Sequence, residues 1–173
     1  MKYLYMFLVV VLQIGCSANR NIKEEKIIKS SKSLCPEDGV CTFEVLKNKS
    51  FKIKKDEFGL SYFNLIDSDK IVLKFQYKRN EIPNTQDGGY VEEIFIEIDE
   101  NTESIELKDS NLKNVNATFA RLCFCRGQTG YYPIKYGNLS IKKLKDNYYI
   151  LKIDFKIDMV PQVMNTIEKT FSL

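Results

Sequence analysis

Apolar and polar side chains alternate along most of the chain from residue 41 onward. Leu73, Phe75 and Tyr77 alternate with lysine and glutamine, and the same period of two recurs in four further stretches: 43–45, 51–53, 94–98 and 149–157. Successive side chains of a β-strand point to opposite faces of the sheet, so this period is typical of strands with one buried face. We therefore expect a series of half-buried β-strands.

Polar and glycine-rich clusters separate these strands and predict the turns. They lie at residues 47–49, 67–69, 87–89, 127–130 and 145–147. Strands at this spacing, with no sustained helical period, predict an all-β fold: an antiparallel β-sandwich or small β-barrel. Residues 111–118 fit neither period and receive no assignment.

The beginning of the chain has a different pattern. Lys2 precedes an uncharged apolar run over residues 3–12, and Gly15 stands directly before Cys16. A positive start, a short apolar run and a small residue before the cut are typical of a secretory signal peptide. The run is too short for a bilayer-spanning helix, which needs about 20 apolar residues.

The residues from Lys2 to Cys16 resemble the signal peptide and lipobox of bacterial lipoproteins, although Gln13 stands where that family usually has Leu. The resemblance implies cleavage before Cys16 and attachment of lipid to its sulfur. We therefore expect a signal peptide over residues 1–15, a lipidated polar tether over 16–34 and a single β domain over 35–173. A polar coil the length of residues 17–34 would span about 25 Å on average.

Charge and histidine content narrow the possible functions. The formal net charge is +3, and lysines are interspersed with acidic residues, so no basic block indicates nucleic acid. The chain has no histidine, which removes the usual general base and the commonest metal ligand. We expect no enzyme, no metal and no cofactor.

Four cysteines remain after Cys16: Cys35, Cys41, Cys123 and Cys125. In an exported protein an even number predicts two disulfides, and the spacings do not match the usual zinc knuckles. Cys123 and Cys125 lie two apart in an expected strand, where their Cα atoms would be about 6.5 Å apart, near the outer limit for a bridge. The favoured pairing therefore joins each of them to the segment 35–41. A local bridge between Cys35 and Cys41 is the alternative.

The segment 126–136 combines aromatic rings with positive charge. It contains Arg126, Tyr131, Tyr132, Lys135 and Tyr136. Rigid amphipathic rings beside cations favour binding surfaces, so these five residues are the candidate binding surface, for an acidic or sugar-bearing partner. The competing interpretation is a strand connection whose tyrosines cover the end of the core.

Two other groups of charged residues have simpler explanations. The acidic residues Glu92, Glu93, Glu97, Asp99 and Glu100 follow one strand, which spreads carboxylates along a line and predicts a solvated face. Arg121 stands between apolar positions, which fits either a buried ion pair or an anion site.

Together these features predict a non-enzymatic binding or assembly lipoprotein of the bacterial envelope, facing the periplasm or the cell exterior. Its expected partners are the membrane, through the lipid anchor, and an envelope protein or glycan. Two alternatives remain open: an inhibitor that inserts a loop into a lytic enzyme or protease, and a glycan hydrolase that uses two carboxylates about 5 to 10 Å apart.

Overall fold

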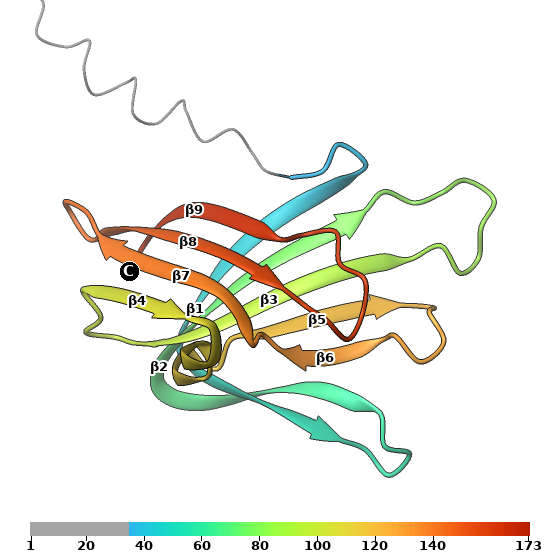
Figure 1. Cartoon of the computed structure of the whole chain (residues 1–173), viewed down its shortest axis with the longest axis horizontal. Coiled ribbons are helices and arrows are strands. Elements are labelled where there is room, and N and C mark those ends of the chain that lie inside the picture. The colour runs from blue at the N-terminus through green and yellow to red at the C-terminus, as the bar shows by residue number, and fades with distance from the viewer. Residues whose placement is uncertain (1–34) are drawn as a thin grey trace, which may run out of the picture. The chain divides into compact units, whose positions relative to one another are not determined.

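The computed structural model describes residues 35–173, and these fold into two antiparallel β-sheets (Figure 1). The first sheet has the order β1-β2-β3-β5-β6 and the second β4-β7-β8-β9. The strands of the first sheet are β1 (Gly39–Lys55), β2 (Ser61–Arg79), β3 (Tyr90–Asp99), β5 (Thr118–Cys123) and β6 (Gly130–Pro133). Those of the second are β4 (Ser104–Lys108), β7 (Tyr136–Lys143), β8 (Tyr148–Lys156) and β9 (Thr166–Ser172). The all-β, antiparallel expectation is confirmed. The expected signal peptide, tether and Cys16 lie outside the described residues.

The main core lies between the two sheets and follows the period of two. Ile94, Ile96 and Ile98 of β3 belong to the same buried cluster as Leu151 and Ile153 of β8. Their polar neighbours point to the outer faces, as the alternation predicts. Each buried branched side chain contributes about 1.5–3 kcal/mol relative to an exposed one.

The first two strands form one hairpin that is much longer than their neighbours. Two predicted turns, at residues 47–49 and 67–69, are wrong, because both segments lie inside these strands and pair with each other. Asn48, at a φ of 56°, marks a bulge where the pairing shifts between Lys47 and Lys49. A bulge bends a strand strongly. The polar residues 47–49 therefore do not end the strand; they bend it, and the hairpin folds back.

The outer half of this hairpin covers the outer face of the first sheet. Phe51, from β1, stacks on Phe63 of β2, and both rings contact Phe95 of β3 at centroid distances of 5.4 and 4.4 Å. Phe51 and Phe95 are buried in a second apolar cluster, separate from the main core, and Tyr131 of β6 packs against it. The first sheet is therefore covered by apolar residues on both faces.

The segment without an assignment, residues 111–118, contains most of a short 3-10 helix, η2 (Asp109–Val115), and ends at the first residue of β5. Leu112 and Val115, three residues apart, are its buried side chains. Asn116 then adopts a left-handed conformation at a φ of 48° and ends the helix. Asparagine tolerates this conformation better than most residues, so the chain can turn directly into β5.

Both disulfides are local: Cys35 bonds to Cys41 and Cys123 to Cys125. The favoured pairing was therefore wrong, and the local alternative for Cys35 and Cys41 is the one present. The strand β5 ends at Cys123 and the chain bends at Phe124, which brings the Cα atoms of Cys123 and Cys125 to 5.2 Å. In an extended strand the two Cα atoms would be about 6.5 Å apart, so the bend at Phe124 is what allows this bridge.

Candidate functional site

The five residues of the expected binding surface do not form one surface. Tyr131 and Tyr132 are consecutive on β6, so their rings point to opposite faces of the first sheet. Tyr131 packs against the outer aromatic cluster and Tyr132 against the main core. Burial raises the pKa of the Tyr131 hydroxyl, with a smaller contribution from the nearby Glu93. These two tyrosines therefore fit the competing interpretation, in which the rings cover the core and do not form a binding surface.

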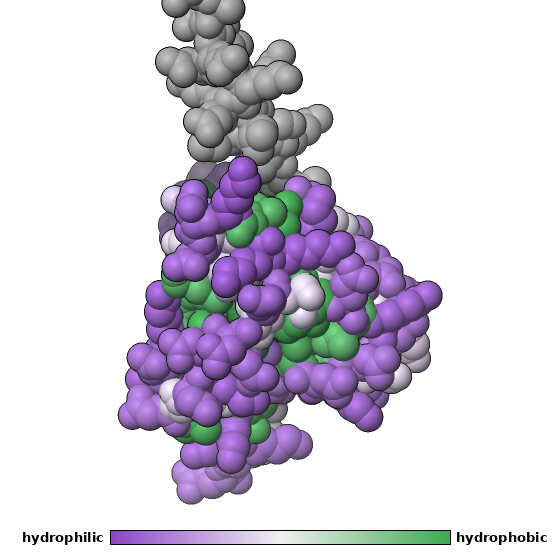
Figure 2. Space-filling model, turned by 90° about the vertical axis from the view of Figure 1, so that its left-hand side faces the viewer, coloured by the Kyte–Doolittle hydropathy of each residue, from purple (hydrophilic) through white to green (hydrophobic). Residues whose placement is uncertain are grey.

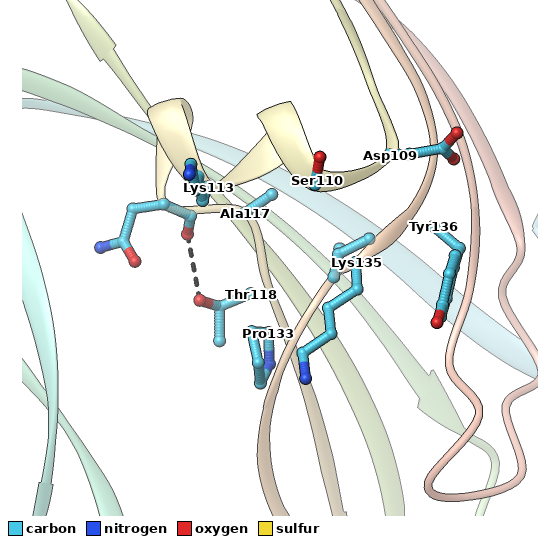
Figure 3. Close-up of a pocket in the computed structure, with 10 residues that line it drawn as sticks. Asp109, Ser110, Lys113, Ala117, Thr118, Pro133, Lys135 and Tyr136 are labelled. Atoms are coloured by element: carbon cyan, nitrogen blue, oxygen red, sulfur yellow. Dashed lines mark hydrogen bonds between the residues drawn. The ribbon is translucent and has the colours of Figure 1, made fainter.

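The other three residues of that set are exposed, and two of them line a pocket. Arg126 lies in the turn between β5 and β6, Lys135 lies between β6 and β7, and Tyr136 is the first residue of β7. Lys135 and Tyr136 form one wall of an open pocket of about 520 Å³ beside η2, which we call the η2 pocket (Figure 3). Its lining residues are Asp109, Ser110, Lys113, Asn116, Ala117, Thr118, Pro133, Ile134, Lys135 and Tyr136.

Hydrogen bonds fix the walls of the η2 pocket. The Ile134 N–H donates to the carbonyl of Ala117 (2.9 Å), which closes the floor with two buried apolar side chains. The Gly137 N–H donates to Asp109 Oδ1 (3.1 Å) and ties η2 to the start of β7. The Thr118 hydroxyl donates to the Asn116 carbonyl (3.0 Å), as Figure 3 shows. The pocket is therefore built before any ligand arrives, and binding would cost little ordering of the backbone.

The charge of the η2 pocket comes mainly from two lysines. Lys113 on η2 and Lys135 on the opposite wall are both exposed, and within the described part of the chain neither side chain forms an ion pair or a hydrogen bond. Asp109 is the one carboxylate among the described lining residues, and the Gly137 N–H already occupies one of its oxygens. Two lysines without partners in the lining of a pocket with an apolar floor suit an anionic ligand with an apolar or ring-shaped body.

The acidic group on β3 differs from the expected solvated face. Glu92 is fully buried and Glu93 nearly so, which makes that expectation wrong for both residues. Glu92 accepts hydrogen bonds from the Tyr90 hydroxyl (2.6 Å) and from the N–H groups of Val163 (2.6 Å) and Met164 (2.7 Å). A buried carboxylate needs such partners, and here they join the β8–β9 loop to the first sheet.

Glu93 points to the outer face and takes part in a second small network. It accepts from Gln76 Nε2 (2.8 Å) and pairs with Lys74 Nζ (2.9 Å). Further along β3, Glu97 is paired with Lys70 (3.0 Å) and accepts from the Ser50 hydroxyl (2.5 Å). Burial would raise the pKa of Glu97, but the hydrogen bonds from Ser50 and Lys70 outweigh it and lower that pKa. These carboxylates are held by partners that stabilise the sheet.

Arg121 is buried beside Glu92, its neighbour in the strand pairing. Its guanidinium donates to Gln128 Oε1 and lies 5.4 Å from the centre of the Tyr90 ring. An amide and an aromatic ring are thus its neighbours here, in place of the carboxylate that one of the two interpretations of Arg121 required. Among residues 35–173, no group of three or more histidine, cysteine or acidic side chains could hold a metal ion.

Comparison of the chain with protein-family models, with curated proteins and with solved structures finds no match. Within residues 35–173, no helix is long and apolar enough to cross a membrane. The site must therefore be interpreted from its own geometry.

The sequence pattern did not indicate Lys113 or Asp109 as part of a site, although both line the η2 pocket. The apolar pair Leu112 and Val115, spaced by three, was the one local indication of a helical turn in this segment. Nothing in the sequence places that turn beside Lys135, because the two segments are brought together by the pairing of β5 with β6 and by the bond from Gly137 to Asp109.

Proposed function

We propose that this chain is a lipid-anchored binding module of the bacterial envelope, whose η2 pocket takes a small anionic ligand such as an acidic saccharide. The observation that carries the proposal is the pair of unpartnered lysines, Lys113 and Lys135, facing an apolar floor in a pocket of about 520 Å³. Tyr136 at the rim supplies a flat ring of the kind on which sugars stack. This chemistry requires binding groups and no catalytic residue.

The pocket is tested by titrating the protein with a uronic-acid oligosaccharide and with a neutral oligosaccharide of equal length. We expect the acidic sugar to bind more tightly. Replacing Lys113→Gln and Lys135→Gln together should weaken it about tenfold, which corresponds to roughly 1.4 kcal/mol. Lys145→Gln is the matched control, because Lys145 is also an exposed lysine but lies in the β7–β8 turn, outside the pocket lining. Equal weakening by the control, or no binding of either sugar, would reject this ligand class.

The anchor is tested separately by labelling cells with a palmitate analogue. The leader and Cys16 predict that the wild-type chain is labelled and that Cys16→Ala is not. Equal labelling of both chains would reject the lipoprotein proposal, and the proposal of a ligand in the η2 pocket would be unaffected.

A second candidate function, inhibition of a lytic enzyme or protease, is favoured by the tip of the β1–β2 hairpin at residues 56–60. Asp56 Oδ1 accepts hydrogen bonds from the N–H groups of Phe58 (2.9 Å) and Leu60 (2.8 Å). In the same turn the Asp56 N–H donates to the Leu60 carbonyl, and the Gly59 N–H donates to the Asp56 carbonyl. This bonding holds Phe58, which is 80% exposed, at the end of a long projecting hairpin (Figure 1). An inhibitor that inserts a loop needs such a preorganised apolar tip.

The two functions are separated by single variants assayed on purified cell-wall hydrolases and proteases. If the tip inhibits one of them, Phe58→Ala should abolish the inhibition and Tyr136→Ala should preserve it. Inhibition that is absent from the wild-type protein, or insensitive to Phe58→Ala, would exclude the second candidate.

A further inference from the structure

One end of the sandwich carries exposed apolar side chains on three separate loops. The loops follow β2, β5 and β8 and span residues 80–89, 124–129 and 157–165. Their most exposed apolar members are Phe124 (82% exposed), Met159 (69%) and Ile82 (52%). Large apolar side chains exposed together on one part of a surface usually mark an interaction site.

The strand register shows that these loops lie at the same end. Tyr90, where β3 begins, pairs with Cys123, where β5 ends, so Phe124 and the loop before Tyr90 are neighbours. The third loop joins them because the Val163 and Met164 N–H groups bond to Glu92, close to the start of β3. In Figure 1 all three loops project towards the right of the view.

The described chain also begins at this end, which we therefore call the entry end. Gly39, the first residue of β1, pairs with Arg79, the last of β2, and the Asn80 N–H donates to the Asp38 carbonyl (2.8 Å). The disulfide between Cys35 and Cys41 fixes the chain here. Residues 17–34 can reach at most about 60 Å from Cys16, and a polar coil of that length averages about 25 Å.

Charges at the entry end are of both signs and partly paired, as in Arg79 with Asp38 and Lys156 with Asp158. A contact made by this end would therefore rest on its apolar side chains. At the opposite end, with the β3–β4 and β7–β8 turns, hydrophilic residues surround separate hydrophobic areas (Figure 2), and Leu144 (48%) and Tyr148 (51%) are less exposed than Phe124 and Met159.

We propose that the entry end rests on the membrane to which the chain is anchored, with Phe124, Met159 and Ile82 in the lipid headgroup region. The inference rests on the proposed lipidation of Cys16, because a short anchored segment brings the entry end, and not the opposite end, close to lipid. Apolar side chains at an interface add to the binding of an acyl anchor. The η2 pocket, at the connection between β6 and β7, then faces away from that membrane.

The chain contains no tryptophan, so one substitution introduces a single fluorescent reporter. Phe124→Trp reports on the entry end, and Tyr148→Trp is its matched control, since Tyr148 is an aromatic residue 51% exposed beside the β7–β8 turn. Each lipidated mature chain is reconstituted in vesicles of phosphatidylethanolamine and phosphatidylglycerol that contain a headgroup-level nitroxide lipid as quencher.

We expect quenching of the Phe124→Trp reporter to exceed that of the control about two-fold or more, with a blue shift for Phe124→Trp alone. Equal quenching at the two positions, or stronger quenching at position 148, would overturn the inference. The mass of each preparation shows whether Cys16 is acylated, so failed anchoring is recognised independently. An unacylated Cys16 is then coupled to a maleimide lipid in the same vesicles, and the quenching comparison decides the inference as before.

Discussion

Tyr131 and Tyr132 are adjacent in the chain and have different surroundings. Tyr131 lies 6.5 Å from the Phe95 ring in the outer cluster, whereas Tyr132 packs against the main core. Tyr136, four residues later, stands exposed at the rim of the η2 pocket. Three tyrosines that look equivalent in the sequence therefore have different roles.

We expect Tyr131→Ala to lower the free energy of unfolding by about 2 kcal/mol, because it removes a half-buried ring from an aromatic cluster. Tyr136→Ala should change it by less than about 0.5 kcal/mol, since the ring is exposed. Urea denaturation of the two variants measures both values. Equal losses would mean that Tyr136 is part of the core packing.

The ionisation of Tyr90 should make the free energy of unfolding depend on pH in the alkaline range. Burial and the neighbouring Glu92 raise the pKa of its hydroxyl from 10.0 to about 12. The folded chain therefore keeps this proton at pH values where the unfolded chain has released it. The contribution is fully present below a pH of about 10 and is lost as the pH rises towards 12.

In urea titrations over that alkaline range, we expect the wild-type protein to lose stability more steeply than Tyr90→Phe, which has no hydroxyl to titrate. The variant also loses a hydrogen bond to Glu92, so the slope with pH, and not the absolute stability, is the quantity to compare. Parallel slopes would show that Tyr90 is not the group that titrates.

At the level of elements, buried polar contacts hold the β8–β9 loop in place. Glu92 on β3 accepts from two consecutive N–H groups of this loop, and Gln162 Nε2 donates to the carbonyls of Phe155 (3.2 Å) and Met164 (2.7 Å). The bonds to Glu92 join the loop to the first sheet, where no strand pairing does, and the bonds from Gln162 hold the loop to β8 and to itself. They also fix the position of Met159 and its loop at the entry end.

We expect Glu92→Gln to lower the free energy of unfolding by about 2 kcal/mol. The amide has one acceptor oxygen where the carboxylate has two, and it carries no charge to strengthen the remaining hydrogen bonds. Amide hydrogen exchange at Val163 and Met164 should become faster than in the wild type. Glu168→Gln is the control, because the Glu168 pair with Lys152 is solvent-exposed and contributes little. Unchanged exchange at both amides would mean that Glu92 does not hold the loop.

At the level of the whole domain, both disulfides are local and close short loops. Their sequence separations are 6 and 2, and the entropic stabilisation by a bridge grows with the length of the loop it closes. The strands are joined instead by their hydrogen bonds and by the apolar core. We therefore expect the bridges to fix the local backbone at the entry end, and the fold to be maintained mainly by the strand pairing and the core.

Thiol counting on the denatured, unreduced protein should find no free thiol among Cys35, Cys41, Cys123 and Cys125. After reduction we expect unchanged far-ultraviolet circular dichroism and a loss of about 2–4 kcal/mol in the free energy of unfolding. Complete unfolding on reduction would show that the core is insufficient without the bridges.

The sequence by itself determined the β fold class and most of the inward-facing residues. The period of two in segments such as 73–77 and 149–157 is a local consequence of strand geometry, so it is visible without a partner strand. Glycine-rich turns at 87–89 and 127–130 were predictable for the same reason.

Only the tertiary structure decided where polar residues are buried and which segments meet. From the sequence Glu92 is expected on a solvated face, but in the structure the β8–β9 loop buries it and supplies its hydrogen-bond donors. Residues 47–49 have the composition of a turn, but in the structure they lie in a hairpin that folds back over Phe95. The η2 pocket likewise needs Lys113 and Lys135 to line one pocket from separate segments, which the pairing of β5 with β6 brings together. Burial and site geometry depend on partners distant in the chain, and a period along one strand contains no information about those partners.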